Sequence, residues 1–199
     1  PEVKEHLLKQ VRTLAAIPGL SGIQLDYMRM PDVQLPRGLW EKYGLDMTEI
    51  APEFDYCYCS RCKAAFDRLN TNQYEHYQTL SVYSLYNLLA DEIRRHGLIA
   101  ACAVFPSPGL ASRMVRQDWR WFHADLVLPM AYHSFYNEPA SWAADISRKA
   151  MQETEGRIPM APGVHLPDIP AAELPAHLDR LRATGVHGIG IFSDDELTP

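Results

Sequence analysis

The segment from Tyr74 to Phe105, YEHYQTLSVYSLYNLLADEIRRHGLIAACAVF, contains the pattern that decides the fold. Its apolar residues recur at helical spacing as far as Ile93, and His96-Gly97 is a typical helix end. The run from residue 98 to 105 is short and almost wholly apolar, which predicts a buried strand. The segment is therefore expected to be a long helix that leads directly into a strand.

The same alternation extends in both directions along the chain. Apolar residues at helical spacing alternate with short apolar runs, and Gly or Pro separates many of them. Helices are predicted at about residues 3–15, 74–95, 116–122, 139–154 and 171–184, and strands at 22–29, 98–105, 125–132, 158–164 and 188–192.

Nearly continuous apolar strands that alternate with helices indicate a parallel sheet covered on both faces. No strand is followed by the G-x-G-x-x-G turn of a nucleotide-binding doubly wound sheet. Polar and aromatic residues follow every strand instead, as they do at the C-terminal face of a (β/α)8 barrel. We therefore predict an α/β fold of the TIM-barrel type, with an open five-stranded sheet as the alternative.

Residues 1–199 are expected to form a single, partial barrel domain, with a long cysteine-bearing loop inserted at about residues 31–73. A complete barrel has eight strands and about 250 residues. We expect this chain to hold about the last five βα units, so that three N-terminal units would lie outside it.

The composition is that of an ordinary globular domain, with 47% hydrophobic and 22% charged residues among 199. The net charge of −6 is spread along the chain, so no nucleic-acid partner is expected. The apolar runs are far shorter than the roughly 20 residues of a membrane-spanning helix. No targeting signal opens the chain, and both a cytoplasmic and an exported location stay open because a signal could precede it.

Asp26 is the first candidate for a catalytic residue. It ends a predicted buried strand, where a carboxylate is costly to bury unless it is paired or used. Arg29 is the expected counter-ion, and Tyr27 and Arg29 could each bind a sugar hydroxyl. The competing interpretation is that Asp26 caps the following loop.

Cleavage of a glycosidic bond normally needs two carboxyl groups. The candidate partner of Asp26 is Asp194, in the acidic cluster closest to its predicted strand, the fifth, although an N-cap followed by the first turn of a helix is the favoured explanation of that cluster. The partner could also lie on the strands expected outside this chain. Other acidic residues that follow predicted strands are Glu138, Asp168, Asp195 and Glu196.

Three further residues after predicted strands are candidates for substrate binding. Tyr132 offers an apolar ring to a sugar, and His133 and His165 have side chains that titrate near neutrality. Each histidine could equally be structural. A metal-dependent hydrolase or deacetylase centred on His133, His165 and Asp168 is a third functional hypothesis.

Cys57, Cys59 and Cys62 form a C-x-C-x-x-C run directly before a helical pattern, which suits tetrahedral zinc. A fourth ligand would come from outside the chain or from a neighbour such as His76, whereas Cys102 is expected to be a buried thiol. A Cys59–Cys62 disulfide and three reduced cysteines are the alternatives. The metal would be structural, and no cofactor is expected to be required for catalysis.

Residues 22–31, GIQLDYMRMP, resemble the G-I-H-L-D-Y-I-R-Y-P strand of bacterial glycosyl hydrolases related to glycoside hydrolase family ten. The segments 105–107 (FPS), 117–119 (QDW) and 125–132 (DLVLPMAY) are similar to segments of that family in the same order. The resemblance implies a (β/α)8 barrel that acts on or binds glycans, with Asp26 on the fourth strand. We therefore expect a glycoside hydrolase, with a non-catalytic carbohydrate-binding barrel as the alternative.

The cysteine run, in CYCSRCKAAF at residues 57–66, is similar to the C-Y-C-x-x-C-x-x-x-F loop of zinc-bearing barrel β-galactosidases, where it likewise follows the fourth strand. The likeness supports a structural zinc. The likeness does not extend to the Asn-Glu pair at the strand end, which is the acid/base signature of those enzymes, because this chain has Leu25-Asp26 there. Their substrate and mechanism are therefore not carried over.

Overall fold

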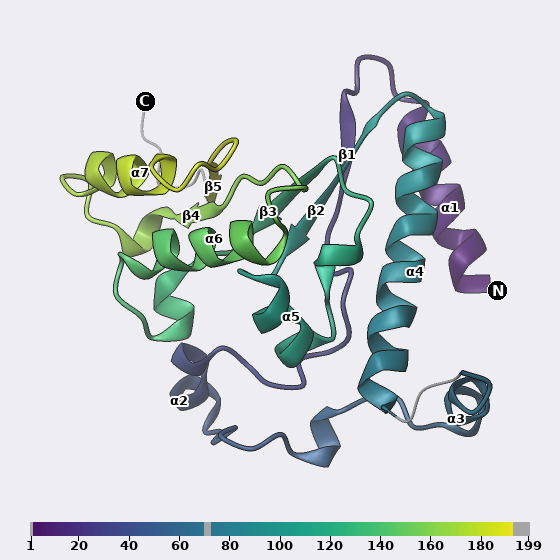
Figure 1. Ribbon diagram of the computed structural model, residues 1–199. Coiled ribbons are helices and arrows are strands. Elements are labelled where there is room, and N and C mark those ends of the chain that lie inside the picture. Colours follow the sequence, from purple (N-terminus) through teal and green to yellow (C-terminus); the bar gives the residue numbers. More distant parts are fainter. Residues whose placement is uncertain (1, 70–72, 193–199) are drawn as a thin grey trace.

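The computed structural model describes residues 2–69 and 73–192, and it shows helices that alternate with short parallel strands (Figure 1). The α-helices are α1 (Glu2–Ala15), α2 (Trp40–Tyr43), α3 (Ser60–Phe66), α4 (Tyr74–Arg95), α5 (Pro108–Val115), α6 (Trp142–Glu153) and α7 (Leu174–Arg182). The strands are β1 (Gly22–Leu25), β2 (Ile99–Val104), β3 (Leu126–Pro129), β4 (Gly163–His165) and β5 (Gly190–Phe192). Single 3-10 turns lie at Arg37–Leu39, Pro52–Phe54, Trp119–Trp121, His133–Tyr136 and Leu166–Asp168.

The strands pair in parallel and in chain order. β2 lies between β1 and β3, and β4 pairs with β5. A parallel bridge between Val127 and Met160 joins β3 to the segment that precedes β4. Successive strands of a (β/α)8 barrel pair in this way, so the barrel stays our proposal for the complete fold.

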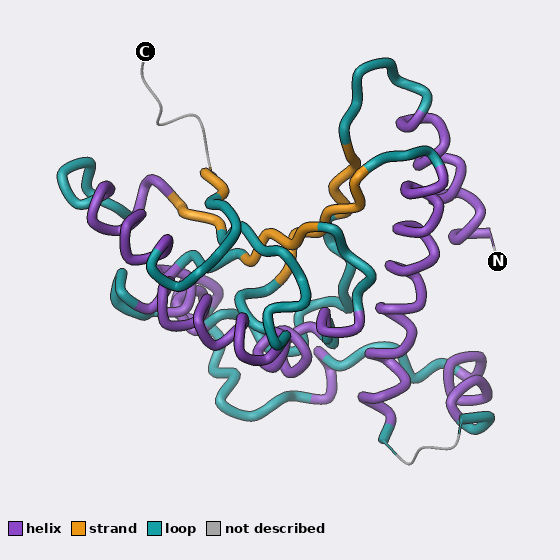
Figure 2. The backbone as a smooth tube through the Cα atoms, turned by 45° about the horizontal axis from the view of Figure 1, so that its top comes forward, coloured by secondary structure: helices purple, strands orange, loops and turns teal. Residues whose placement is uncertain are grey.

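The strands follow a curved line, and the helices lie along its outer side (Figure 2). The main core packs α4 and α5 against β1, β2 and β3, and it contains Tyr86, Ile93, Val104 and Trp119 with almost no solvent exposure. A second cluster packs α6 and α7 against β4. Side chains alternate between the two faces of a strand. Those that do not face the helices lie on the inner side of the curve, where they can line a site.

Most predicted elements are confirmed, and α4 has the predicted bounds. The helix predicted at 116–122 is wrong, because the helix is α5, which ends at Val115, and the 3-10 turn Trp119–Trp121 follows it. Ser107 caps α5 by accepting a hydrogen bond from the Leu110 N–H, Pro108 occupies its first turn, and Arg116 ends it with φ 55°. Ser followed by Pro is a helix-start signal, and it was present in the sequence.

β1, β2 and β3 end before their predicted C-terminal ends, whereas β4 and β5 begin later than predicted. The strand predicted at 22–29 ends at Leu25, because Tyr27 adopts φ 54°, which a strand cannot accommodate. The predicted loop at 31–73 also contains α2 and α3. No helix among the described residues is long and apolar enough to cross a membrane.

Candidate functional site

A pocket of about 540 Å³ lies on the inner side of the strands, at their C-terminal ends. Asp26 follows β1, Phe105 follows β2, and Tyr132 lies three residues after β3. The remaining lining residues come from the strands, from the loop after β1 and from the segment after β3: Gln24, Tyr27, Arg29, Asp32, Leu35, Pro36, Leu39, Ala103, Leu128, Met130, Phe135, Tyr136, Gly163, Gly190, Ile191 and Phe192. The pocket thus gathers four of the predicted site residues, Asp26, Tyr27, Arg29 and Tyr132.

Asp26 is exposed at the edge of this pocket. Its Oδ1 accepts a hydrogen bond of 2.7 Å from the backbone N–H of Tyr27. The positive φ of Tyr27 turns the chain sharply there, and the Arg29 N–H then donates to the Tyr27 carbonyl at 2.8 Å. A bulky residue in the left-handed region is uncommon and costs energy, so the turn that places Asp26 is held by its surroundings.

Arg29 does not serve as the counter-ion of Asp26. Its Nη1 lies 3.2 Å from Oδ2 of Asp32, and its guanidinium lies over the rings of Tyr27 and Phe105, at 4.7 and 5.3 Å from their centroids. Asp32 is therefore a second carboxylate in the pocket, and it was not among the predicted site residues. The only signal for it in the sequence is its position three residues after Arg29.

Aromatic rings form the opposite wall. The Tyr132 ring stacks on Phe192 with centroids 5.5 Å apart and planes inclined by 17°, and it meets Phe135 edge-on at 5.6 Å. Burial, and secondly the charge of Asp26, raises the pKa of Tyr132 to about 12, so this phenol stays protonated near neutral pH. The Tyr132 ring can pack against β4 because residue 163 is a glycine. A Cβ at that position would lie 2.9 Å from the Cε1 atom of Tyr132.

The structure separates the two predicted histidines. His165 contacts Tyr132, Phe135 and Phe192, with centroid distances of 5.4 to 5.8 Å, and so it lies behind the aromatic wall. Its Nδ1 is 2.8 Å from Oδ2 of Asp168, although not in the direction of a hydrogen bond.

His133 is directed elsewhere. Its ring is 6.4 Å from that of His177 on α7, and it does not line the pocket. Burial lowers the pKa of His177, with smaller contributions from Arg180 and His133. Within residues 2–69 and 73–192, His133, His165 and Asp168 do not form a set that could share one metal ion. The metal-dependent hypothesis therefore gains no support from geometry.

Gln117 and Trp119 hold the strand ends in place. The Oε1 of Gln117 accepts a hydrogen bond from the Phe105 N–H at 2.9 Å, and its Nε2 donates to the Met28 carbonyl at 3.1 Å. The indole N–H of Trp119 donates to the Phe105 carbonyl at 3.1 Å. Both side chains are fully buried. The QDW segment of the sequence thus connects the loops after β1 and β2.

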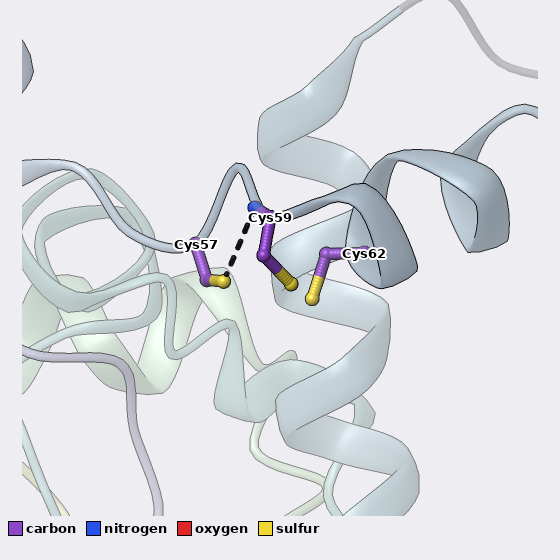
Figure 3. Close-up of side chains that lie close together, drawn as sticks. All are labelled: Cys57, Cys59 and Cys62. Atoms are coloured by element: carbon purple, nitrogen blue, oxygen red, sulfur yellow. Dashed lines mark hydrogen bonds between the residues drawn. The ribbon is translucent and has the colours of Figure 1, made fainter.

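Cys57, Cys59 and Cys62 form a second candidate site. Their sulfur atoms lie within 4.8 Å of one another, and the side chains lie close together (Figure 3). Hydrogen bonds from the backbone N–H of Cys62 and from the thiol of Cys57 lower the pKa of Cys59 to about 7, whereas burial raises that of Cys62. All three are free thiols, so the arrangement is one that a metal ion could occupy.

The cysteine loop is attached to the first turns of α4. The Tyr74 hydroxyl donates to the Cys57 carbonyl, and the buried amide of Gln78 donates to the Tyr56 carbonyl and to Asp55. Tyr58 stacks on Tyr74 with centroids 4.4 Å apart. His76, the predicted neighbouring ligand, is exposed and does not belong to the cysteine group.

Asp194, the predicted second carboxylate, lies outside the described residues, as do Asp195 and Glu196. No family model matches the chain, and no curated protein matches it. The resemblance to the family-ten-related hydrolases therefore rests on the quoted residues, and the activity that it implies is a proposal.

Proposed function

We propose that the protein is a glycoside hydrolase and that Asp26 is one of its two working carboxyl groups. The observation that carries this proposal is the position of Asp26 in a pocket at the C-terminal ends of parallel strands, which the ring of Tyr132 also lines. Barrel enzymes place their chemistry at this edge. A carboxylate that faces an aromatic wall matches a sugar, which has hydroxyl groups around its rim and apolar C–H faces.

The second carboxyl group is proposed to be Asp194 or Asp32. Asp32 lines the pocket with Asp26, but it is paired with Arg29. Asp194 follows β5, whose Phe192 belongs to the aromatic wall. One carboxyl group would protonate the leaving oxygen, and the other would attack the sugar or activate water.

The test is the hydrolysis of a panel of oligosaccharides by the wild type and by the variants Asp26→Asn, Asp32→Asn and Asp194→Asn. Loss of a working carboxyl group should lower kcat by a factor of about 100 or more. Asp179→Asn is the matched control, because Asp179 is exposed on α7 and its ion pair within the described part of the chain is with Arg182. Hydrolysis by Asp26→Asn at the wild-type rate would refute the proposal. Glycan binding without turnover would favour the carbohydrate-binding alternative.

We also propose that Cys57, Cys59 and Cys62 hold a structural zinc ion. Thiolates on one tetrahedral zinc, each about 2.3 Å from the metal, lie about 3.8 Å apart, which these cysteines reach with small movements. The acidified thiol of Cys59 favours the thiolate that a metal needs. Tyr74 and Gln78 fix the loop, so the ion would stabilise the attachment of the loop to α4.

Metal analysis of the purified protein tests this second proposal. About one zinc per chain is expected, and Cys59→Ser should lose it, whereas Cys102→Ala, which alters a buried thiol of β2, should retain it. Chelation should lower the melting temperature while hydrolysis at low temperature continues. A wild-type protein without zinc, or a Cys59–Cys62 disulfide in it, would contradict the proposal.

A further inference from the structure

A second pocket, of about 420 Å³, lies beside the first and has no role in the proposed chemistry. It is open to one side and is lined by the loop at residues 34–40, by α5, by α6 and by the segment before α6. Leu35 and Tyr136 line both pockets and form the wall between them. The other lining residues are Gln34, Arg37, Trp40, Gly109, Leu110, Arg113, Met114, Glu138, Trp142, Ile146 and Lys149.

This second pocket is positively charged in a chain whose net charge is −6. Three cationic side chains line it, Arg37, Arg113 and Lys149, against one carboxylate, Glu138. Lys149 is 3.7 Å from Glu153, but within the described residues Arg37 and Arg113 have no ion-pair partner. Two guanidinium groups that form no ion pair within the described residues match an anion at this pocket, since their planar N–H groups pair with carboxylate or sulfate oxygens.

Aromatic rings give the pocket apolar walls. The Trp40 indole N–H donates to the Leu35 carbonyl at 2.8 Å, and Trp142 packs on Tyr136 with centroids 4.8 Å apart. The loop lies tightly against the neighbouring turn, because a Cβ on Gly38 would lie 2.3 Å from the Ser134 carbonyl oxygen. The rings are therefore held in place before a ligand arrives, which reduces the entropy cost of binding.

We propose that this pocket binds an acidic sugar, a pyranose residue that carries a carboxylate or a sulfate group. The anion would pair with Arg37 and Arg113, and the ring would lie against Trp40 or Trp142. The sugar part rests on the proposed glycoside hydrolase function, whereas the anion part rests on the charges of the pocket. Because the two pockets share a wall, the substrate class that follows is an acidic polysaccharide with a charged residue next to the cleaved one.

The test is a titration of the full chain with D-glucuronate, D-glucose 6-sulfate, D-glucose and inorganic sulfate, followed by the NMR signals of the Trp40 and Trp142 indole N–H groups. The two charged sugars should bind about tenfold more tightly than glucose, since a charge-assisted hydrogen bond contributes about 1.5 kcal/mol or more. Their relative affinities distinguish a uronate from a sulfate ester as the natural group.

Arg37→Gln and Arg113→Gln should each lower the affinity for the charged sugars by about tenfold and leave the affinity for glucose unchanged. Glu138→Gln, which removes the negative charge from the pocket, should raise the affinity for the charged sugars. Arg148→Gln is the matched control, because Arg148 neighbours Lys149 on α6 but pairs with Asp145 and does not line the pocket. It should bind as the wild type does.

Equal affinity for glucose and glucuronate, or full affinity in Arg113→Gln, would overturn the proposal. Inorganic sulfate that binds as tightly as the charged sugars would overturn its sugar part. Failure of this proposal can be distinguished from failure of the hydrolase proposal. Glucuronate binding at Trp40 and Trp142 should persist in Asp26→Asn whether or not that variant hydrolyses a glycan.

Discussion

Arg29 is paired with Asp32, with 3.2 Å between Nη1 and Oδ2, and this pair lies in the wall of the candidate site. The guanidinium is mostly buried, because it is also covered by the rings of Tyr27 and Phe105. The pair therefore fixes the loop after β1 without neutralising Asp26. Among the described residues, the carboxylate of Asp26 accepts one hydrogen bond, from the Tyr27 N–H, and its exposed side can meet a ligand.

A double-mutant cycle measures this relationship. Arg29→Met and Asp32→Asn should each lower the free energy of unfolding, and the double variant should lose less than the sum of the two. The coupling energy should be about 1 kcal/mol, as for a partly exposed ion pair, from urea unfolding. Strict additivity would show that the two side chains do not interact in solution.

Gln117→Leu should destabilise the protein by about 2 to 4 kcal/mol. The substitution leaves the buried Phe105 N–H and Met28 carbonyl without their partner, and each such group costs about 1 to 3 kcal/mol. Gln152→Leu on the exposed side of α6 is the control and should stay within about 0.5 kcal/mol. Equal stability of the two variants would mean that Gln117 does not connect the strand ends.

Gly163→Ala should displace Tyr132 and destabilise the protein by about 1 to 3 kcal/mol, because the new Cβ would lie 2.9 Å from Cε1. Glycan affinity should fall with it. Gly190→Ala is the matched control and should have little effect. Gly190 pairs with Gly163 in the neighbouring strand, and a Cβ on Gly190 would meet no atom nearer than 3.7 Å. Equal stability of the two variants would show that Tyr132 does not pack against Gly163 of β4.

The stability of the contact between α1 and α4 should depend on acid pH through Glu92. This buried carboxylate lies 2.6 Å from both Arg12 and Arg95, and the bonds to them, Arg12 first, lower its pKa from 4.5. Because the folded-state pKa is the lower one, the contribution is fully present above about pH 4.5 and is lost as the pH falls through the folded-state value.

Urea unfolding of the wild type and of Glu92→Gln between pH 7 and pH 3 checks this. The variant should be the less stable at pH 7, and the difference should shrink toward pH 3. Glu155→Gln, at an exposed carboxylate, provides the comparison. A constant difference across the range would exclude Glu92 as the titrating group.

The sequence was sufficient for the elements whose pattern is strong and local. The apolar face of α4 and the run of β2 predicted a helix and a strand that the structure confirms. The strand ends were not predictable in the same way, because β1 stops where Tyr27 enters the left-handed region, and nothing in GIQLDYMRMP requires that. The start of α5 was predictable from Ser107-Pro108, but the aromatic-rich segment at 116–122 also has a helical pattern and competes with that signal.

The candidate site divides in the same way. Residues within a few positions of a strand end, such as Asp26 and Tyr132, were found from the sequence because parallel strands bring their C-terminal ends together. Asp32, Phe192 and the cationic pocket were missed, since their proximity depends on how loops cross the edge of the sheet. His133 was placed in the site by its position after a strand, but the turn that it begins directs its ring toward His177.

The sequence by itself determined the alternation of helices and strands, the polar strand ends and the close spacing of the three cysteines, because these depend on periodicity and on neighbours along the chain. Only the tertiary structure decided that Arg29 pairs with Asp32, that Gln117 joins two strand ends and that Arg37, Arg113 and Lys149 share one pocket. Such contacts join residues far apart in the chain or depend on how a side chain is directed, and packing sets both.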